Sequence, residues 1–142
     1  MDFLVSLPKA LADLVTSYLK LRGDDRARQR LADLLGRVAD CVSAIGNNIA
    51  EGTHSAELCS ELQSYIENIH QFIAREIDER TATKLTFWLQ HVEAVPGYAR
   101  LRLSDLAEEV HPPWLASTRK TRAEELQAIA GAIRGVSAMI RI

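Results

Sequence analysis

The chain has 142 residues, which suffices for one domain with a full hydrophobic core that needs neither disulfides nor metals. Hydrophobic residues make up 47% and charged residues 25% of the chain, a globular composition that argues against disorder. The net charge of −2 argues against a protein that mainly coats nucleic acid, because such proteins are strongly basic.

The first expected element is an amphipathic helix within residues 1–22. Its apolar residues recur at alternating spacings of three and four and so share one stripe: Leu4, Leu7, Leu11, Leu14, Tyr18 and Leu21. Pro8 suits a first helical turn, which would leave the residues before it as a short apolar arm, and Gly23 is placed to end the helix. Such a segment either packs on a bundle or lies in a membrane interface.

The two longest stripes with helical spacing come next. The second helix starts at Asp24 or Asp25 and stops at Gly52, and its stripe consists of Leu31, Leu34, Leu35, Val38, Cys41, Val42, Ile45 and Ile49. The third helix has Thr53 or Ser55 as its cap, and its stripe consists of Leu58, Leu62, Ile66, Ile69, Ile73 and Ile77.

Two shorter helical segments are expected after a loop at residues 78–80. The fourth helix starts at Thr81 or Thr83, and Pro96–Gly97 stops it because proline cannot continue a helix. A fifth segment covers residues 98–110 and ends before a pair of prolines.

The last helix is expected to begin at a capping box formed by Thr121 and Glu124. Its stripe consists of Leu126, Ile129, Ile133, Val136 and Ile140. No segment alternates with a period of two, so we predict an all-α protein, a single bundle of about five to six helices with a four-helix-bundle core. We predict one domain, 1–142, with an N-terminal amphipathic helix at 1–22, core helices at 24–95 and C-terminal helices at 98–142.

The sequence does not point to an enzyme. Its four histidines are scattered, and no nucleophile turn, glycine-rich phosphate loop or Cys-x-x-Cys pair accompanies them. Glu67 with His70 and Glu108 with His111 form two Glu-x-x-His motifs, but the further carboxylates of a di-iron site are missing. We therefore expect no catalytic residue, no cofactor and no metal, and we expect Cys41 to pack as a small hydrophobe.

Two sets of residues suit a contact with a membrane. The candidates for insertion are the apolar residues at the start of the first helix: Phe3, Leu4, Val5, Leu7, Leu11 and Leu14. The candidates for binding anionic lipid headgroups are the arginines where the first helix turns into the second: Arg22, Arg26, Arg28 and Arg30. The alternative for these arginines is a solvated helix start with ion pairs to neighbouring acids.

The second and third helices carry a pattern of small, apolar, Cys and Tyr positions. It consists of Leu31-Ala32, Val38-Ala39-Asp40-Cys41, Ile45, Ile49-Ala50-Glu51-Gly52, Cys59-Ser60-Glu61-Leu62 and Tyr65. This pattern, within roughly residues 30–101, resembles the bacterial Bell domains, which are relatives of the fungal HeLo domain and of the four-helix cell-death domains of plants and animals. A shorter string, Asn48–Gly52, is similar to one in the ribosome-associated four-helix bundles encoded within rRNA intervening sequences.

The resemblance to Bell domains implies a non-enzymatic effector of regulated cell death, often antiphage, that permeabilises the inner membrane on activation. The expected partners are anionic lipids, an NLR-type or other sensor, and further copies of the chain, with no nucleic acid. Because the sequence shows neither a signal peptide nor a membrane span, we expect it to be cytoplasmic at rest and recruited to the inner membrane on activation. The alternative is a helical adaptor that recruits another effector without touching lipid.

Overall fold

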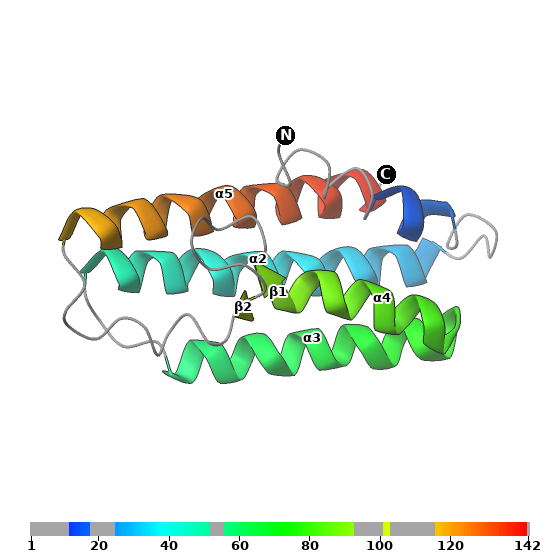
Figure 1. Ribbon diagram of the computed structural model, residues 1–142. Helices are drawn as coiled ribbons and strands as arrows, with labels where there is room; N and C mark the ends of the chain where they lie inside the picture. The colour runs from blue at the N-terminus through cyan, green and yellow to red at the C-terminus, as the bar shows by residue number, and fades with distance from the viewer. Residues whose placement is uncertain (1–11, 18–24, 52–55, 93–100, 103–115, 142) are drawn as a thin grey trace.

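The computed structural model describes residues 12–17, 25–92 without 52–55, 101–102 and 116–141. The described residues form an all-α bundle, as predicted (Figure 1). Its elements are a helical segment at residues 12–17, α2 (Asp25–Glu51), α3 (Ala56–Glu76), α4 (Glu79–Gln90), the two-residue strands β1 (His91–Val92) and β2 (Leu101–Arg102), and α5 (Ala116–Arg141).

The core lies where the predicted stripes of the helices meet. The six residues that we expect to be buried from the helical spacing are buried: Leu34, Val38, Ile45, Leu62, Ile66 and Ile69. The predicted stripe of α5 is buried along its whole length, whereas the α3 stripe ends in the half-buried Leu58 and Ile77. Burial of one face of each helix therefore holds the bundle together, at about 25 cal/mol for each Å² of apolar surface removed from water.

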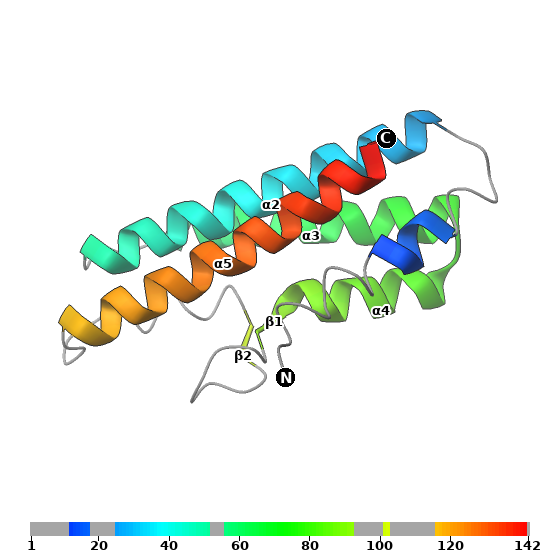
Figure 2. The ribbon, with the colours of Figure 1, turned by 90° about the horizontal axis from the view of Figure 1, so that it is seen from above.

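The most extensive helix contact joins α2 to α5, which are far apart in the sequence (Figure 2). The two helices run antiparallel, since Arg134 and Arg141 late in α5 pair with Asp40 and Asp33, in reverse order, on α2. Gly46 lies where the two helices are close, since an added Cβ would be 3.3 Å from the carbonyl oxygen of Ala123. The other face of α2 packs on α3, and α3 in turn packs on α4.

The start of α4 corrects the prediction that residues 78–80 form a loop before a helix beginning at Thr81 or Thr83. The helix begins at Glu79, and the backbone N–H of Thr81 donates to Oδ1 of Asp78 at 2.6 Å. Asp78 is therefore the N-cap. Aspartate is a better N-cap than threonine, which agrees with the helix beginning after Asp78 rather than at Thr81 or Thr83.

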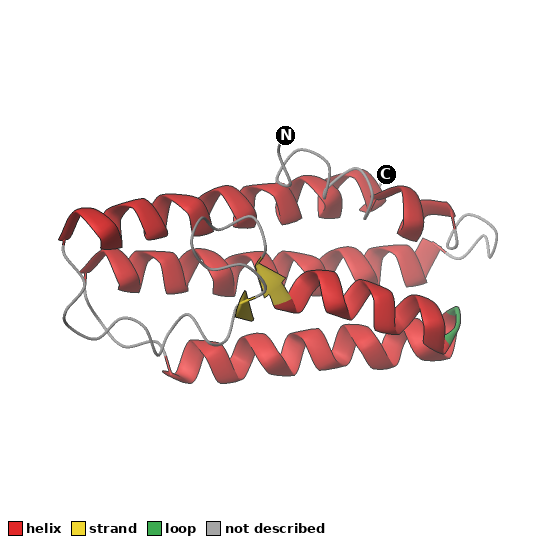
Figure 3. Ribbon diagram, in the orientation of Figure 1, coloured by secondary structure: helices red, strands yellow, loops and turns green. Residues whose placement is uncertain are grey.

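The end of α4 corrects a second prediction, that this helix continues to Pro96–Gly97 and that residues 98–110 are helical. The helix ends at Gln90, and His91–Val92 pairs antiparallel with Leu101–Arg102 (Figure 3). Helical spacing over two or three apolar residues does not distinguish a helix end from a short strand, and β-branched Val92 is favourable in a strand. The remaining residues between 93 and 110 lie outside the described part of the chain.

The start of α5 corrects a third prediction, the capping box at Thr121 and Glu124. The helix begins at Ala116, so Thr121 lies in its second turn rather than at its end. The sequence has neither glycine nor proline between Ala116 and Thr121, so nothing stops the helix from extending toward the N-terminus.

Candidate functional site

Three arginines lie on one stripe of α2 and line a groove between α2 and α3. Arg26, Arg30 and Arg37 are separated by four and seven residues, which places them on the same side of a helix with 3.6 residues per turn. The groove has a volume of about 390 Å³, and Tyr65 and Asn68 of α3 form its other wall. A smaller hollow of about 210 Å³ adjoins it at Arg37 and Tyr65, and its other lining residues are Asp40, Cys41, Leu58 and Glu61.

Arg37 contacts an aromatic ring of α3. Its guanidinium carbon lies 5.8 Å from the centroid of the Tyr65 ring, within the range of a cation–π contact. The predicted set of arginines did not include Arg37, although its spacing from Arg26 and Arg30 places it on the same stripe. The contact lowers the number of conformations that Arg37 adopts, so less entropy is lost when an anion binds to it.

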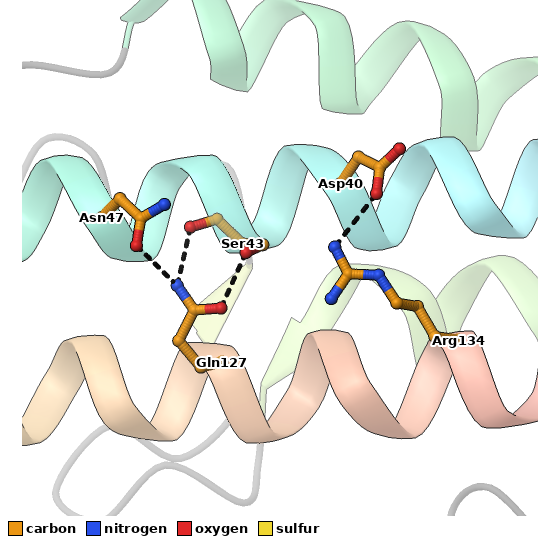
Figure 4. Close-up of polar contacts among 5 residues, drawn as sticks. All are labelled: Asp40, Ser43, Asn47, Gln127 and Arg134. Carbon is orange, nitrogen blue, oxygen red and sulfur yellow. Dashed lines mark hydrogen bonds and ion pairs between the residues drawn. The ribbon is translucent and has the colours of Figure 1, made fainter.

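The acidic residues on this side of α2 are paired with arginines of α5. Arg141 Nη2 lies 3.0 Å from Oδ1 of Asp33. Arg134 Nη2 lies 3.0 Å from Oδ1 of Asp40, as Figure 4 shows. Asp33 is one turn away from both Arg30 and Arg37, yet within the described residues neither of them has an ion pair with it. Asp33, which also lines the groove, is therefore paired with Arg141 rather than with Arg30 or Arg37.

The predicted headgroup-binding arginines are placed differently from one another. Arg26 and Arg30 are exposed, whereas Arg28 has a side chain only 25% exposed. The Nε of Arg28 donates to the carbonyl oxygen of Ile140 at 3.3 Å, near the C-terminal end of α5, and its Nη1 lies 3.7 Å from Asp25. Arg28 thus stabilises the end of α5, where a positive charge is favourable. Arg22 lies outside the described residues.

Polar side chains fix the register of α5 against α2. The Oγ of Ser43 donates to Oε1 of Gln127 at 2.7 Å, and Nε2 of Gln127 donates to the Ser43 carbonyl oxygen at 2.9 Å and to Asn47 at 3.0 Å (Figure 4). In addition, the buried hydroxyl of Ser137 donates to the carbonyl oxygen of Ala32 at 2.7 Å. Sliding α5 by one turn would break all of these bonds, so α5 has one preferred position.

Of the residues predicted to insert into a membrane, the structure describes Leu14. It is half-buried, while Ala12 and Val15 in the same helical segment are fully buried. Successive helical residues are about 100° apart, so the segment faces the bundle with Val15 and carries Leu14 on its flank. Phe3, Leu4, Val5, Leu7 and Leu11 lie outside the described residues.

The first of the two Glu-x-x-His motifs is engaged in other contacts. Nε2 of His70 lies 3.0 Å from Oε1 of Glu79, and Nδ1 lies 3.1 Å from the hydroxyl of Thr86, while Glu67 is exposed. His70 therefore ties α3 to α4. Within the described ranges, no three His, Cys, Asp or Glu side chains come together as a metal site would require, and the second motif lies outside those ranges.

Cys41 is buried and forms no disulfide among the described residues, in agreement with its predicted role as a small core residue. In the part of the chain that the structure describes, no helix combines the length and the apolar character needed to cross a bilayer. Comparisons of the chain with protein-family models, with curated proteins and with solved structures found no match. The resemblance to Bell domains thus stays a prediction from the sequence.

Proposed function

We propose that the protein is a non-enzymatic effector of regulated cell death, similar to Bell and HeLo domains, that permeabilises the inner membrane on activation in antiphage defence. It is cytoplasmic at rest, responds to an NLR-type or other sensor, and oligomerises at anionic lipid. The observation that supports this proposal is the combination of exposed Arg26 and Arg30 on α2 with an N-terminal helical segment, 12–17, that is apolar on one side.

The described N-terminal segment is held by modest contacts. Burial of a valine side chain such as Val15 contributes about 1.5–3 kcal/mol, and Ala12 contributes less. A bias of about 5.5 kcal/mol between two states moves a population from 1:99 to 99:1. A sensor or a lipid surface that binds the open state better than the closed state by about 5.5 kcal/mol is therefore enough to release the segment.

Dye leakage from anionic liposomes tests this proposal. We expect the wild-type protein, once activated, to release the dye, and we expect Leu4→Glu to abolish both leakage and toxicity in cells with little change in melting temperature. Interfacial binding scales with the apolar area that enters the membrane, and a charge at Leu4, in the short apolar arm before Pro8, removes that contribution. A well-folded Leu4→Glu variant with full killing activity would contradict the membrane mechanism.

Met139→Glu is the matched control, because it also replaces a large apolar side chain by a glutamate. Met139 is 53% exposed on α5, and it is the large hydrophobic residue that stands out as exposed among those described. This exposure favours the second candidate function, a helical adaptor that binds its effector through a helix face. A variant Met139→Glu that loses toxicity, while Leu4→Glu retains it, would support the adaptor.

The contribution of charge is tested with salt and with charge reversal. We expect binding to anionic vesicles to weaken as salt rises, because the Debye length falls from about 10 Å at 0.1 M to about 3 Å at 1 M. The double variant Arg26→Glu/Arg30→Glu should weaken binding further and keep the fold, since both side chains are exposed. The control Arg75→Glu/Arg80→Glu changes the net charge equally at exposed positions of α3 and α4. Equal loss in both double variants, or equal binding to neutral vesicles, would remove the arginines of α2 from the mechanism.

A further inference from the structure

The groove between α2 and α3 has the chemistry of a binding site for phosphate groups. Arginine presents a planar fork of N–H donors that matches the oxygens of a phosphate, and three arginines line this one groove. The amide of Asn68 and the half-buried Tyr65 add neutral hydrogen-bonding groups beside them. A volume of about 390 Å³ is that of a small-molecule site rather than of a single ion.

The spacing of the arginines sets the number of phosphates. Arg26 and Arg30 are one turn apart, or about 6 Å along the helix axis, so both side chains reach a phosphate placed between them. Arg37 lies about 10 Å farther along the axis from Arg30. Its guanidinium lies over the Tyr65 ring in the groove, at a separation that suits a second charged group on the same ligand.

Within the described residues, Arg30 and Arg37 have no carboxylate partner, because the nearby carboxylate is bound by the neighbouring helix. Arg141 of α5 binds the carboxylate of Asp33, the acid that lies between Arg30 and Arg37 on α2. Across the described residues, Arg30 has no ion pair, and the contact of Arg37 is with a neutral ring. An anionic ligand entering the groove would therefore not have to displace a carboxylate from either arginine.

We propose that this groove binds a ligand with two phosphate groups separated by a small organic spacer, with one phosphate between Arg26 and Arg30 and the other at Arg37. Such chemistry has two sources, a soluble bisphosphate and a lipid headgroup with two phosphates bridged by glycerol. The proposal goes beyond the membrane activity proposed above, because a soluble bisphosphate binds the same groove without any bilayer.

Calorimetric titration of the full chain with fructose 1,6-bisphosphate, with inorganic phosphate as the single-phosphate probe, tests the proposal. We expect saturable binding of the bisphosphate with one site per chain and much weaker binding of inorganic phosphate. Arg30→Gln and Arg37→Gln should each weaken bisphosphate binding by roughly tenfold or more, since each removes a charge-assisted contact. Arg37→Lys keeps the charge but loses the fork and the stacking on Tyr65, so its affinity should lie in between.

Arg75→Gln is the matched control. Arg75 is likewise an exposed arginine over an aromatic ring, 5.9 Å from the centroid of Phe72, but it lies outside the groove. Its substitution should leave bisphosphate binding unchanged. An equal loss of affinity in Arg75→Gln and Arg37→Gln would overturn the proposal, because the binding would then reflect overall charge.

Vesicles separate the two sources. Vesicles containing cardiolipin carry paired phosphates, and vesicles of phosphatidylglycerol with the same total charge carry single ones. Preference for cardiolipin that Arg30→Gln and Arg37→Gln abolish assigns the groove to a lipid headgroup, and bisphosphate binding without that preference assigns it to a soluble ligand. Absence of saturable binding in both arms overturns the proposal. Leakage that fails while bisphosphate binding persists contradicts the membrane effector but not the groove.

Discussion

Replacing Leu62 with alanine is expected to lower the free energy of unfolding by about 2–5 kcal/mol. Leu62 has no exposed surface and belongs to the core cluster shared by α2, α3, α4 and α5. The substitution removes apolar contacts and leaves a cavity that neighbours on several helices cannot all fill. Chemical denaturation monitored by circular dichroism measures the change. Because a small domain has a total free energy of unfolding of about 5–15 kcal/mol, this single substitution is expected to remove a large share of it.

Two further variants make this result specific to burial. Leu62→Met keeps the volume and should cost less than about 1.5 kcal/mol. Met139→Ala truncates an exposed side chain of α5 and should change the stability by about 0.5 kcal/mol or less. If Leu62→Ala were as mild as Met139→Ala, the arrangement of α3 in the core would be wrong.

Gly46→Val is expected to lower the free energy of unfolding by about 1–3 kcal/mol through overpacking between α2 and α5. A Cβ on Gly46 would lie 3.3 Å from the carbonyl oxygen of Ala123 and 3.3 Å from Cβ of Leu126. Both atoms are fixed by the backbone of α5, so the two helices must separate to admit the side chain. Only the amide of Gln127, at 3.0 Å, is able to swing away, and doing so breaks its bonds to α2.

Gly135→Ala is the control for this experiment, because it adds a side chain to a helical glycine that has nothing within 4 Å of the new Cβ. Alanine is about 1 kcal/mol more favourable than glycine inside a helix, so this variant should be more stable than the wild type. The test is whether the free energy of unfolding falls in Gly46→Val and rises in Gly135→Ala. A stabilising Gly46→Val would contradict the close approach of α2 and α5.

Apolar spacing predicted the long helices well and their ends less well. The predicted limits of α2, Asp24 or Asp25 to Gly52, agree with Asp25–Glu51. A stripe of eight apolar residues with helical spacing fits one continuous helix and little else. The start of α4 depends on one hydrogen bond to Asp78, and several residue types in that stretch are able to cap a helix. The pairing of β1 with β2 depends on backbone hydrogen bonds between two segments that are separated in the sequence. The apolar spacing within either segment carries no information about that pairing.

The candidate site was predicted in part, for a related reason. Arg26 and Arg30 were identified as charges near a helix start. Arg37 is distinguished by its contact with Tyr65 of α3, which the sequence does not show. Likewise, the sequence does not reveal that Arg28 is directed toward the carbonyl of Ile140, 112 residues away, and is thereby removed from the candidate set. Charge patterns along the chain give the composition of a surface, whereas the tertiary contacts decide which charges face one another.

The pairing of α2 with α5 has a consequence for folding during synthesis on the ribosome. α5 ends about 90 residues after α2, and synthesis at about 5–20 residues per second therefore separates the two helices by roughly 5–20 s. During that interval α2 is able to pack on α3, but Ile45 and Ser43 lie on a helix whose other partner has not yet emerged. The apolar surface of α2 that packs on α5 is thus exposed for seconds in the nascent chain. That time is long enough for a chaperone, or another copy of the same chain on a neighbouring ribosome, to bind it before α5 does.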